Sequence, residues 1–363
     1  MILAVLVPQG VRQWRTVSGS SMNSKDSTHR APTESDVAQA AGVSQSAVSR
    51  AFTPGASIAV ATRAKILAAA EDLGYQPNLM ARSLATRRSN IVALSIAYLE
   101  NPFYAQVVKV LSDRLRETGR HILLFTTATE GQIDPAIEQV LSYQVDSVIM
   151  TATLASPELA AQCRKSGVPI VQINRSSKLA GVSTVFGENY RAGRIVGAFL
   201  AAGQHKRFGF IGGAESSHTS RQRLDGFHDA LAEAGLHELE NAHGHNNFEG
   251  AAAATRKFLS MKTRPDALFC ASDYMAFAAL DVARREFGLN VPEQLSVVGF
   301  DDVPEASHAA YDLTTFSQPA ATLVEEAISI IDGMRGQSHP RAKHVQVEGK
   351  LVVRGSARIP DPR

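Results

Sequence analysis

From Ile91 onward the chain repeats one pattern, in which a short apolar run is followed by an amphipathic helical stretch. The apolar runs have the length of strands, and they are Ile91–Ala97, His121–Thr126, Ser147–Thr151, Pro169–Ile173, Phe208–Ile211, Ala267–Cys270 and Ser296–Phe300. The helical stretches include Ala105–Glu117, Arg191–Ala202, Arg221–Ala234 and Tyr274–Phe287. Such alternation predicts parallel sheets with helices on both faces. We expect two doubly wound α/β lobes, with a ligand crevice at the carboxyl ends of their strands.

The length of the chain predicts a second, smaller domain ahead of this pattern. At 363 residues the chain is too long for one compact core, because single cores stop growing near about 250–300 residues. We divide it into residues 1–30, an extension or a mis-assigned start upstream of Met22; 31–76, a helical head; 77–90, a segment that joins the head to the rest; and 91–363, a body of two lobes. We assign residues 1–30 no function.

Composition excludes several classes of protein. The mean hydropathy is −0.08, and no apolar run approaches the ~20 residues that span a membrane. The two cysteines, Cys163 and Cys270, cannot form a disulfide scaffold or a cysteine-rich zinc site, and they suit a reducing compartment. The apolar run Met1–Val7 lacks a basic leading segment and is cut off by Pro8, which argues against a secretory signal. We predict a cytoplasmic protein without membrane contact.

Charge is distributed unevenly along the chain. Residues 1–90 contain ten Lys and Arg against five Asp and Glu, whereas the remainder contains 27 against 30. A basic head on a slightly acidic body predicts contact with a polyanion at the N-terminal end.

The head is predicted to form three short helices. Thr33 and Asp36 have the spacing of a capping box, Gly42 ends the first helix, and Ser44 caps the second. A third helix is expected over Val60–Leu73. The expected core residues are Val37, Ala38, Ala41, Val43, Val48, Ala51, Phe52, Ile66, Leu67, Ala70 and Leu73.

The first two helices follow the helix-turn-helix plan, with a tight turn at Gly42 between them. The second helix is expected to point Gln45, Ser46, Ser49 and Arg50 outward. Short polar groups and an arginine on one helix edge suit the base edges and phosphates of a DNA major groove. The alternative for this segment is a small helical bundle with no nucleic-acid role.

Several longer sequence motifs are more specific than the helix-turn-helix pattern alone. Residues 41–52 read AGVSQSAVSRAF, residues 62–78 read TRAKILAAAEDLGYQPN, and residues 81–86 read ARSLAT. Together with the motifs Asn101–Tyr104, Ile173–Arg175, Arg223–Phe227, Ser272–Ala276 and Ser296–Asp302, these runs resemble the LacI/GalR family of transcriptional regulators. The resemblance extends from about Ser35 to Ser356. It implies a body with the type I fold of periplasmic sugar-binding proteins.

On this resemblance Gln45, Ser46 and Arg50 take the base-reading positions of the recognition helix. Residues 78–85 match the hinge helix of the family, and Leu84 matches the leucine that wedges into the minor groove. The full expected DNA-binding set is Ser35, Ser44, Gln45, Ser46, Ser49, Arg50, Thr53, Asn78, Ala81 and Leu84. Thr53 and Ala59 depart from the usual Asn and Ser of the family, which puts one phosphate contact and one helix cap in doubt.

For the body, the resemblance best supports Arg223 and Asp273 as effector-binding residues. A carboxylate accepts hydroxyl donors and a guanidinium donates in a fork, which suits a polar metabolite. Phe103, Arg175, Ser217 and Phe248 complete the expected set. The alternative for these four is core packing or a surface hydrogen bond.

The sequence therefore predicts a homodimeric repressor of operator DNA, switched by a sugar or sugar-derived effector. Whether the effector releases or strengthens DNA binding is left open, with release as our hypothesis. No heptad pattern follows Arg358, which favours a dimer over a tetramer. One alternative is a periplasmic-type receptor without DNA binding. Another is a nucleotide-dependent enzyme, but no phosphate loop or catalytic set is present, so we predict no enzyme activity, no cofactor and no metal at His243 and His245.

Overall fold

The computed structural model describes residues 30–53, 55–76, 88–127, 137, 139–335, 337 and 341–360. The chain divides at residue 78 into two compact units. We call the first the head and the second the body, and each is described by itself.

The head consists of α1 (Glu34–Ala41), α2 (Gln45–Ala51) and α3 (Val60–Asp72). The carboxylate of Asp36 reaches back to accept the backbone N–H of Thr33 at 2.7 Å. Gly42 ends α1 in the left-handed conformation, with a φ of 62°. The hydroxyl of Ser44 accepts the Ala47 N–H at 3.3 Å and so caps α2. These predicted helix boundaries are confirmed.

The core of the head contains fewer fully buried residues than the sequence predicted. Its buried residues are Val37, Ala38, Ala41, Val48, Ala51, Ile66 and Ala70. Leu67 and Leu73 were expected there, but they are 43% and 40% exposed. The reason is geometric, because Ile66 and Ala70 lie one turn apart on the face of α3 that meets α1 and α2, whereas Leu67 lies about 100° around the helix.

The body contains two six-stranded sheets, one in each lobe. The first sheet contains β1 (Ile91–Ala97), β2 (His121–Thr127), β3 (Ser147–Thr151), β4 (Ile170–Ile173), β5 (Val182–Gly187) and β11 (His344–Val347), in the order β11-β5-β4-β3-β1-β2. All its neighbouring strands pair in parallel. We call this part the first lobe.

The second lobe is built in the same way. Its sheet contains β6 (Phe208–Gly212), β7 (Leu239–His243), β8 (Ala267–Cys270), β9 (Ser296–Asp301), β10 (Thr314–Ser317) and β12 (Leu351–Val352), in the order β12-β10-β9-β8-β6-β7. The pair β10–β12 is antiparallel and the other pairs are parallel. The predicted pair of doubly wound lobes is confirmed.

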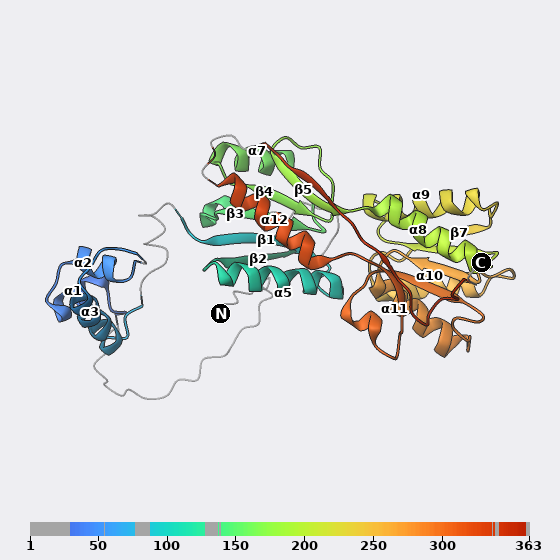
Figure 1. Cartoon of the computed structure of the whole chain (residues 1–363), viewed down its shortest axis with the longest axis horizontal. Coiled ribbons are helices and arrows are strands. Elements are labelled where there is room, and N and C mark those ends of the chain that lie inside the picture. Colours follow the sequence, from blue (N-terminus) through green and yellow to red (C-terminus); the bar gives the residue numbers. More distant parts are fainter. Residues whose placement is uncertain are drawn as a thin grey trace, which may run out of the picture. The chain divides into compact units, whose positions relative to one another are not determined.

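Helices cover the faces of both sheets (Figure 1). They are α5 (Pro102–Glu117), α7 (Pro157–Ser166), α8 (Asn189–Ala202), α9 (His218–Glu233), α10 (Phe248–Leu259), α11 (Asp273–Asp281) and α12 (Ala320–Met334), with the shorter turns η1 (Val140–Tyr143), η2 (Val282–Glu286) and η3 (Pro304–Ser307). Helix α5 begins three residues before its predicted start, because Asn101 caps it and Pro102 occupies its first turn. None of the described helices combines the length and the apolar character that a membrane crossing requires.

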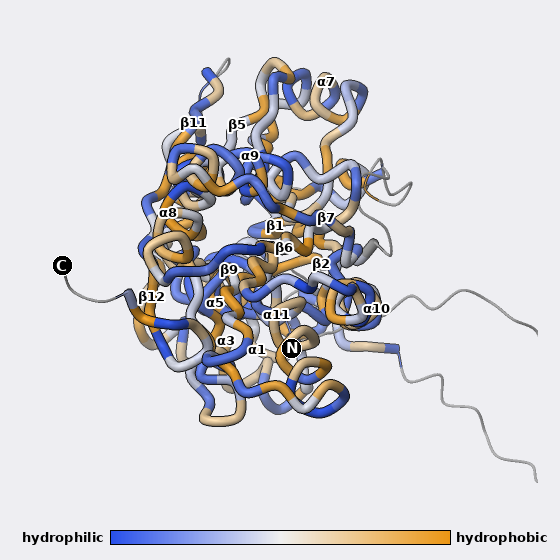
Figure 2. The backbone as a smooth tube through the Cα atoms, turned by 90° about the vertical axis from the view of Figure 1, so that its right-hand side faces the viewer, coloured by the Kyte–Doolittle hydropathy of each residue, from blue (hydrophilic) through white to orange (hydrophobic). Residues whose placement is uncertain are grey.

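Several inner strands are buried along almost their whole length, including polar residues such as Ser95, Gln172 and Asp301. Residues 92–97 of β1 and all of β3, β4, β6, β8 and β9 are buried. Figure 2 shows hydrophobic residues gathered on the strands inside the body, while hydrophilic residues follow many of the outer turns. Continuous apolar runs are what parallel strands covered on both faces require.

The described chain passes between the two lobes three times. It leaves the first lobe between β5 and α8, returns between β10 and α12, and leaves again between β11 and β12. Figure 1 shows these connecting segments side by side between the lobes. Three backbone segments of this kind are suited to a movement of one lobe relative to the other, because each can absorb a change in its own dihedral angles.

Helices α8 and α9 pack closely through glycines. A Cβ atom at Gly193 would lie 2.1 Å from the carbonyl oxygen of Arg223, and one at Gly226 would lie 2.0 Å from that of Tyr190. The two backbones can approach this far only because neither residue has a side chain. This contact fixes the position of α9, which carries Arg223, against α8.

The substitution Gly193→Ala should lower the free energy of unfolding by roughly 1–3 kcal/mol or more, because the new methyl group forces the two helices apart. Gly333→Ala is the matched control within a helix, since its Cβ would meet nothing closer than the Lys343 Nζ at 3.7 Å. That control should stabilise the protein by up to about 1 kcal/mol. Urea denaturation measures both, and equal stability of the two variants would contradict the close-packing argument.

Candidate functional site

The predicted recognition edge of the head is exposed. Gln45, Ser46, Ser49 and Arg50 all point away from the core, while Val48 and Ala51 of the same helix are buried. Ser35 on α1 is also exposed. A short helix with one buried and one polar, exposed side is what a major-groove reader needs.

The side chains of this edge are ordered by bonds within α2. The Nε of Arg50 donates to the Ser46 carbonyl at 3.1 Å, and the hydroxyl of Thr53 donates to the Ser49 carbonyl at 2.9 Å. The hydroxyls of Ser44 and Ser46 lie 2.9 Å apart. Ser44 thus caps the helix rather than pointing freely outward. The remaining expected DNA-binding residues, Asn78, Ala81 and Leu84, lie outside the described residues.

A cavity of about 30 Å³ lies between the two lobes of the body. The first lobe supplies Asn101, Phe103, Tyr104, Asn174 and Arg175, and the second supplies Ser217, Thr219, Ser220, Arg223, Asn246, Ala271, Ser272 and Asp301. Most of these residues directly follow a strand or begin a helix. They therefore gather at the carboxyl ends of the strands, which is where the alternation of strands and helices predicted a crevice.

The loops around this cavity contain unusual backbone. Tyr98, Asn174 and Asn246 have φ values of 56°, 61° and 56°, in the left-handed region that non-glycine residues avoid. Each such residue costs about 1–3 kcal/mol, and residues of this kind concentrate at binding sites. Burial raises the pKa of the Tyr98 hydroxyl in the first lobe, and the side chain of Asn246 in the second lobe lowers it by a smaller amount.

Arg223 is the most constrained charge in the cleft. Its Nε donates to the Asn189 Oδ1 at 2.9 Å, its Nη1 donates to the Ala271 carbonyl, and its guanidinium lies 3.3 Å from the centre of the Phe300 ring. Burial lowers the pKa of this guanidinium to about 10, against the opposing charge of Asp301. The group is held in one orientation before any ligand arrives.

Asp273, which the sequence predicted to bind the effector, makes its hydrogen bonds within the second lobe. Its carboxylate accepts the Thr315 hydroxyl at 2.6 Å and the Val303 N–H at 2.9 Å, and it is fully buried. It does not line the cavity. It connects the start of α11 to β10 and to the turn after β9. These bonds hold in place the strand ends from which the lining of the cleft extends.

Asp301 and Arg175 are the other buried charges that line the cleft. Burial raises the pKa of the Asp301 carboxyl well above its ordinary value, with Arg223 acting in the opposite direction. Burial also lowers the pKa of Arg175, which is only 8% exposed. Asp301 has a positive φ of 127°, so its carboxyl is delivered into the cavity by a strained turn at the end of β9.

Four of the six predicted effector residues meet at one cavity, namely Phe103, Arg175, Ser217 and Arg223. Phe248 lies elsewhere, with its ring 6.0 Å from that of Tyr274, and Asp273 lies beneath the cavity. The cavity residues that the prediction missed are Asn101, Tyr104, Asn174, Thr219, Ser220, Asn246, Ala271, Ser272 and Asp301. Their signal was their position directly after a strand or at a helix start. For Asn246 the sequence contained no such signal, only its place in a turn-rich segment.

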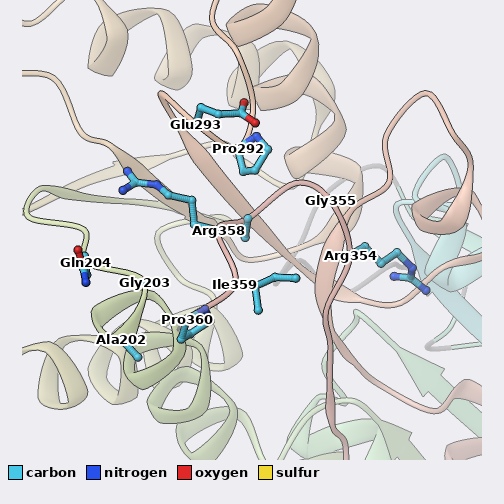
Figure 3. A pocket seen from close by; sticks show the side chains of 11 residues that line it. Ala202, Gly203, Gln204, Pro292, Glu293, Arg354, Gly355, Arg358, Ile359 and Pro360 are labelled. Carbon is cyan, nitrogen blue, oxygen red and sulfur yellow. The ribbon is translucent and has the colours of Figure 1, made fainter. Parts of the chain in front are cut away.

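A larger hollow, of about 780 Å³, opens at the other edge of the second sheet (Figure 3). It is lined by the end of α8, the turn before β9 and the segment 354–360. None of the predicted site residues reaches it. The convergence of polar side chains, and not the size of the opening, marks the cleft as the candidate site.

Comparisons with known proteins agree with this architecture. Residues 33–78 match the model of bacterial regulatory proteins of the lacI family, and residues 196–357 match that of the periplasmic binding protein-like domain. The repressor CytR of Escherichia coli K12 is 30% identical over 332 residues, which cover 90% of this chain and 97% of that protein. The chain belongs to the lacI family of regulatory proteins. It is therefore a DNA-binding transcriptional regulator and not an enzyme.

Two solved structures extend the comparison. The complex of the regulator CelR with cellobiose is 30% identical, covers 90% of this chain and 100% of its own, and superposes with a TM-score of 0.62. The lac repressor dimer bound to operator and the anti-inducer ONPF is 25% identical, covers 90% and 99%, and has a TM-score of 0.77. The match at the head removes the alternative of a receptor without DNA binding.

Asp273 should make the stability of the body depend on pH. Burial raises its pKa from 3.8 to about 7, so the folded protein retains a proton that the unfolded chain releases. The free energy of unfolding should therefore fall as the pH rises from about 4 to about 7. In Asp273→Asn this fall should be shallower, whereas Glu240→Gln, at an exposed carboxylate of β7, should retain it. Urea titrations across this range measure the slopes, and an unchanged slope in Asp273→Asn would refute the assignment.

Proposed function

We propose that this regulator is a cytoplasmic repressor that binds its operator as a homodimer and changes its affinity when a sugar or sugar-derived effector occupies the cleft. Residues 31–76 act as the DNA-binding head, 77–90 as the hinge, and 91–363 as the effector-binding and dimerisation domain. The observation that carries the proposal is the convergence of polar side chains from both lobes on one cavity.

The small size of the cavity supports a switch. Pockets that hold small molecules measure about 300–1,000 Å³, whereas this cavity holds about 30 Å³. An effector larger than a water molecule can enter only if the lobes move apart or turn on their three connections. Binding therefore favours one arrangement of the lobes over another, and a ligand that discriminates between two states shifts their populations.

The lining of the cleft supports a carbohydrate. Asn101, Asn174 and Asn246 offer amide donors and acceptors, while Arg175 and Arg223 offer several fixed N–H donors. Phe103 and Tyr104 supply aromatic surface beside them, with ring centres 5.3 Å apart. A molecule with many hydroxyl groups around a small apolar face matches this arrangement, and cellobiose is such a molecule in the CelR complex.

The DNA side of the proposal rests on the exposed edge of α2. In a symmetric dimer two such edges read half-sites one helical turn apart, about 34–36 Å, or a multiple of that distance. The lac repressor structure, a dimer on its operator, supports this arrangement. Leu84 in the hinge is proposed to wedge into the minor groove between the half-sites.

Selection of bound sequences from random duplex DNA tests this function. We expect the purified protein to enrich a near-palindrome, with an affinity that falls steeply as salt rises, because phosphate contacts release counterions. Arg50→Ala should lose about 1–3 kcal/mol of discrimination at one base pair of each half-site, as expected for a bidentate contact with guanine. Gln39→Ala, an exposed change on α1 outside the expected set, is the control.

Two results of that selection would count against the proposal. Equal weakening of Arg50→Ala on every sequence would show that this side chain touches only phosphate. Failure of the unmodified protein to bind duplex DNA at low salt, with or without sugars, would overturn the DNA-binding function itself.

The cleft is tested by a pair of substitutions. Arg175→Gln should weaken binding of the effector by tenfold or more, since hydrogen bonds to charged groups contribute about 1.5–3 kcal/mol. Arg256→Gln, the same change at an exposed arginine that pairs with Glu286 and does not line the cavity, should leave that affinity unchanged. A thermal-shift screen of neutral sugars, sugar phosphates and nucleosides identifies the compound, and calorimetry measures its affinity. An unchanged affinity in Arg175→Gln would remove this residue from the site.

A further inference from the structure

Asp146 lies at the edge of the first sheet that faces away from the cleft. It directly precedes β3, and its side chain is only 12% exposed. Its Oδ1 accepts the N–H of Ser89 at 2.9 Å and the hydroxyl of Ser89 at 3.0 Å, and its Oδ2 accepts the N–H of Asn90 at 3.2 Å. Arg335 donates to the same Oδ2 at 3.3 Å. We call these four residues the Asp146 clasp.

The clasp fixes the point at which the body begins. The Ser89 hydroxyl also accepts the N–H of Ile91 at 3.1 Å, and the backbone N–H of Asp146 donates to the Ile91 carbonyl at 2.8 Å. Asn90 is held in the left-handed conformation, with a φ of 56°, while its carbonyl accepts the His121 N–H at 2.7 Å. The backbone of residues 89–91, where the body begins, is therefore fixed by one carboxylate and its neighbours.

Arg335 connects the clasp to the far side of the lobe. It follows the last residue of α12, a helix of 15 residues that spans about 22 Å. The other end of α12 comes directly after Gln318 and Pro319, where the chain crosses between the lobes. There the Gln318 N–H donates to the carbonyl of Asp301, a residue that lines the cleft, at 3.0 Å.

Helix α12 is held as a rigid element between these two ends. The guanidinium of Arg120 binds both oxygens of Asp332, at 2.7 and 3.1 Å, and Arg114 on α5 pairs with Glu325 at 2.6 Å. The inward face of α12 is buried along its length, and Figure 1 shows the helix lying across the first lobe. A packed helix moves as a body rather than absorbing a displacement, because interiors are dense and poorly compressible.

We infer that the Asp146 clasp is the connection through which movement at the cleft reaches the DNA-binding head, with α12 as the element that carries it. Asp146 and Arg335 are positioning residues, since neither lines the cleft nor belongs to the head. This inference rests on the proposed function. It adds a defined contact at which cleft and head are coupled, and coupling between two sites requires an element whose state both sites bias.

The first test asks whether the clasp positions the head on DNA. Asp146→Asn retains the size of the side chain but loses the charge that pairs with Arg335 and one oxygen that accepts hydrogen bonds. We expect the ratio of affinities for the selected operator and for a random duplex of equal length to fall about tenfold, within the 5–150-fold range of ordinary coupling. Glu286→Gln, which breaks an exposed pair with Arg256 in the second lobe and touches neither α12 nor the clasp, should leave the ratio unchanged.

The second test asks whether the clasp transmits the state of the cleft, and it needs no effector. Tyr98→Phe removes the hydroxyl of the first lobe that interacts with Asn246 of the second lobe, so it should change operator affinity in the full-length protein. In an Arg335→Gln background the same change should have no effect, whereas in a Glu286→Gln background it should persist. This double-mutant cycle measures coupling directly.

These outcomes separate the inference from its alternatives. An operator-to-random ratio in Asp146→Asn equal to that of the unmodified protein, or additive effects of Tyr98→Phe and Arg335→Gln, would overturn it. If Asp146→Asn fails to fold, as judged by circular dichroism, Arg335→Gln decides, because it leaves the bonds to Ser89 and Asn90 intact. If the unmodified protein does not bind operator DNA, that result would instead refute the proposed function.

Discussion

Two parallel strands of one sheet cannot be joined by a tight turn, and this constraint organises the whole body. Each connection between parallel strands has to return along the outside of the sheet before the next strand begins, so the carboxyl ends of the parallel strands meet at one edge. In both lobes that edge meets the cleft, where Arg175, Arg223 and Asp301 converge. The opposite edge of the first sheet is left for anchoring, and Asp146 holds the beginning of the body there. Recognition and attachment are thus separated by the direction of the strands.

Much of the fold could be predicted from the sequence, because a strand that is buried on both faces is usually a continuous run of apolar residues. Strands β1, β3 and β8 were predicted to the residue, since each is a continuous apolar run between polar neighbours. Strands β7, β11 and β12 were missed because they lie at sheet edges and are partly exposed, so no continuous apolar run marks them. The inner strands β5 and β10 were also missed, because serine and threonine residues interrupt their apolar runs. Leu67 shows a limit of predicting burial within a helix. The periodicity of apolar residues indicates which side of the helix is buried but not how wide the buried stripe is.

The cleft was harder to predict than the fold. Asp273 and Ser272 both stand at the start of α11, but the carboxylate of Asp273 turns toward Thr315 and Val303, which are distant in sequence. No local pattern contains that information. Asn246 reaches the cavity through a left-handed turn that has no motif of its own. The strand-end rule found where the cavity lies, and long-range packing decided which side chains enter it.

The three passages of the chain between the lobes bear on how such regulators can be recombined. Strand β11 completes the first sheet and β12 the second, although both come from the last residues of the chain. Neither lobe is one continuous stretch of sequence, so a single junction within the body would mix strands from two parents in the same sheet. Grafting one lobe onto a relative requires matched junctions at all three passages, whereas the whole sensor transfers with one junction between head and body. Chimeras built at that single boundary preserve every sheet.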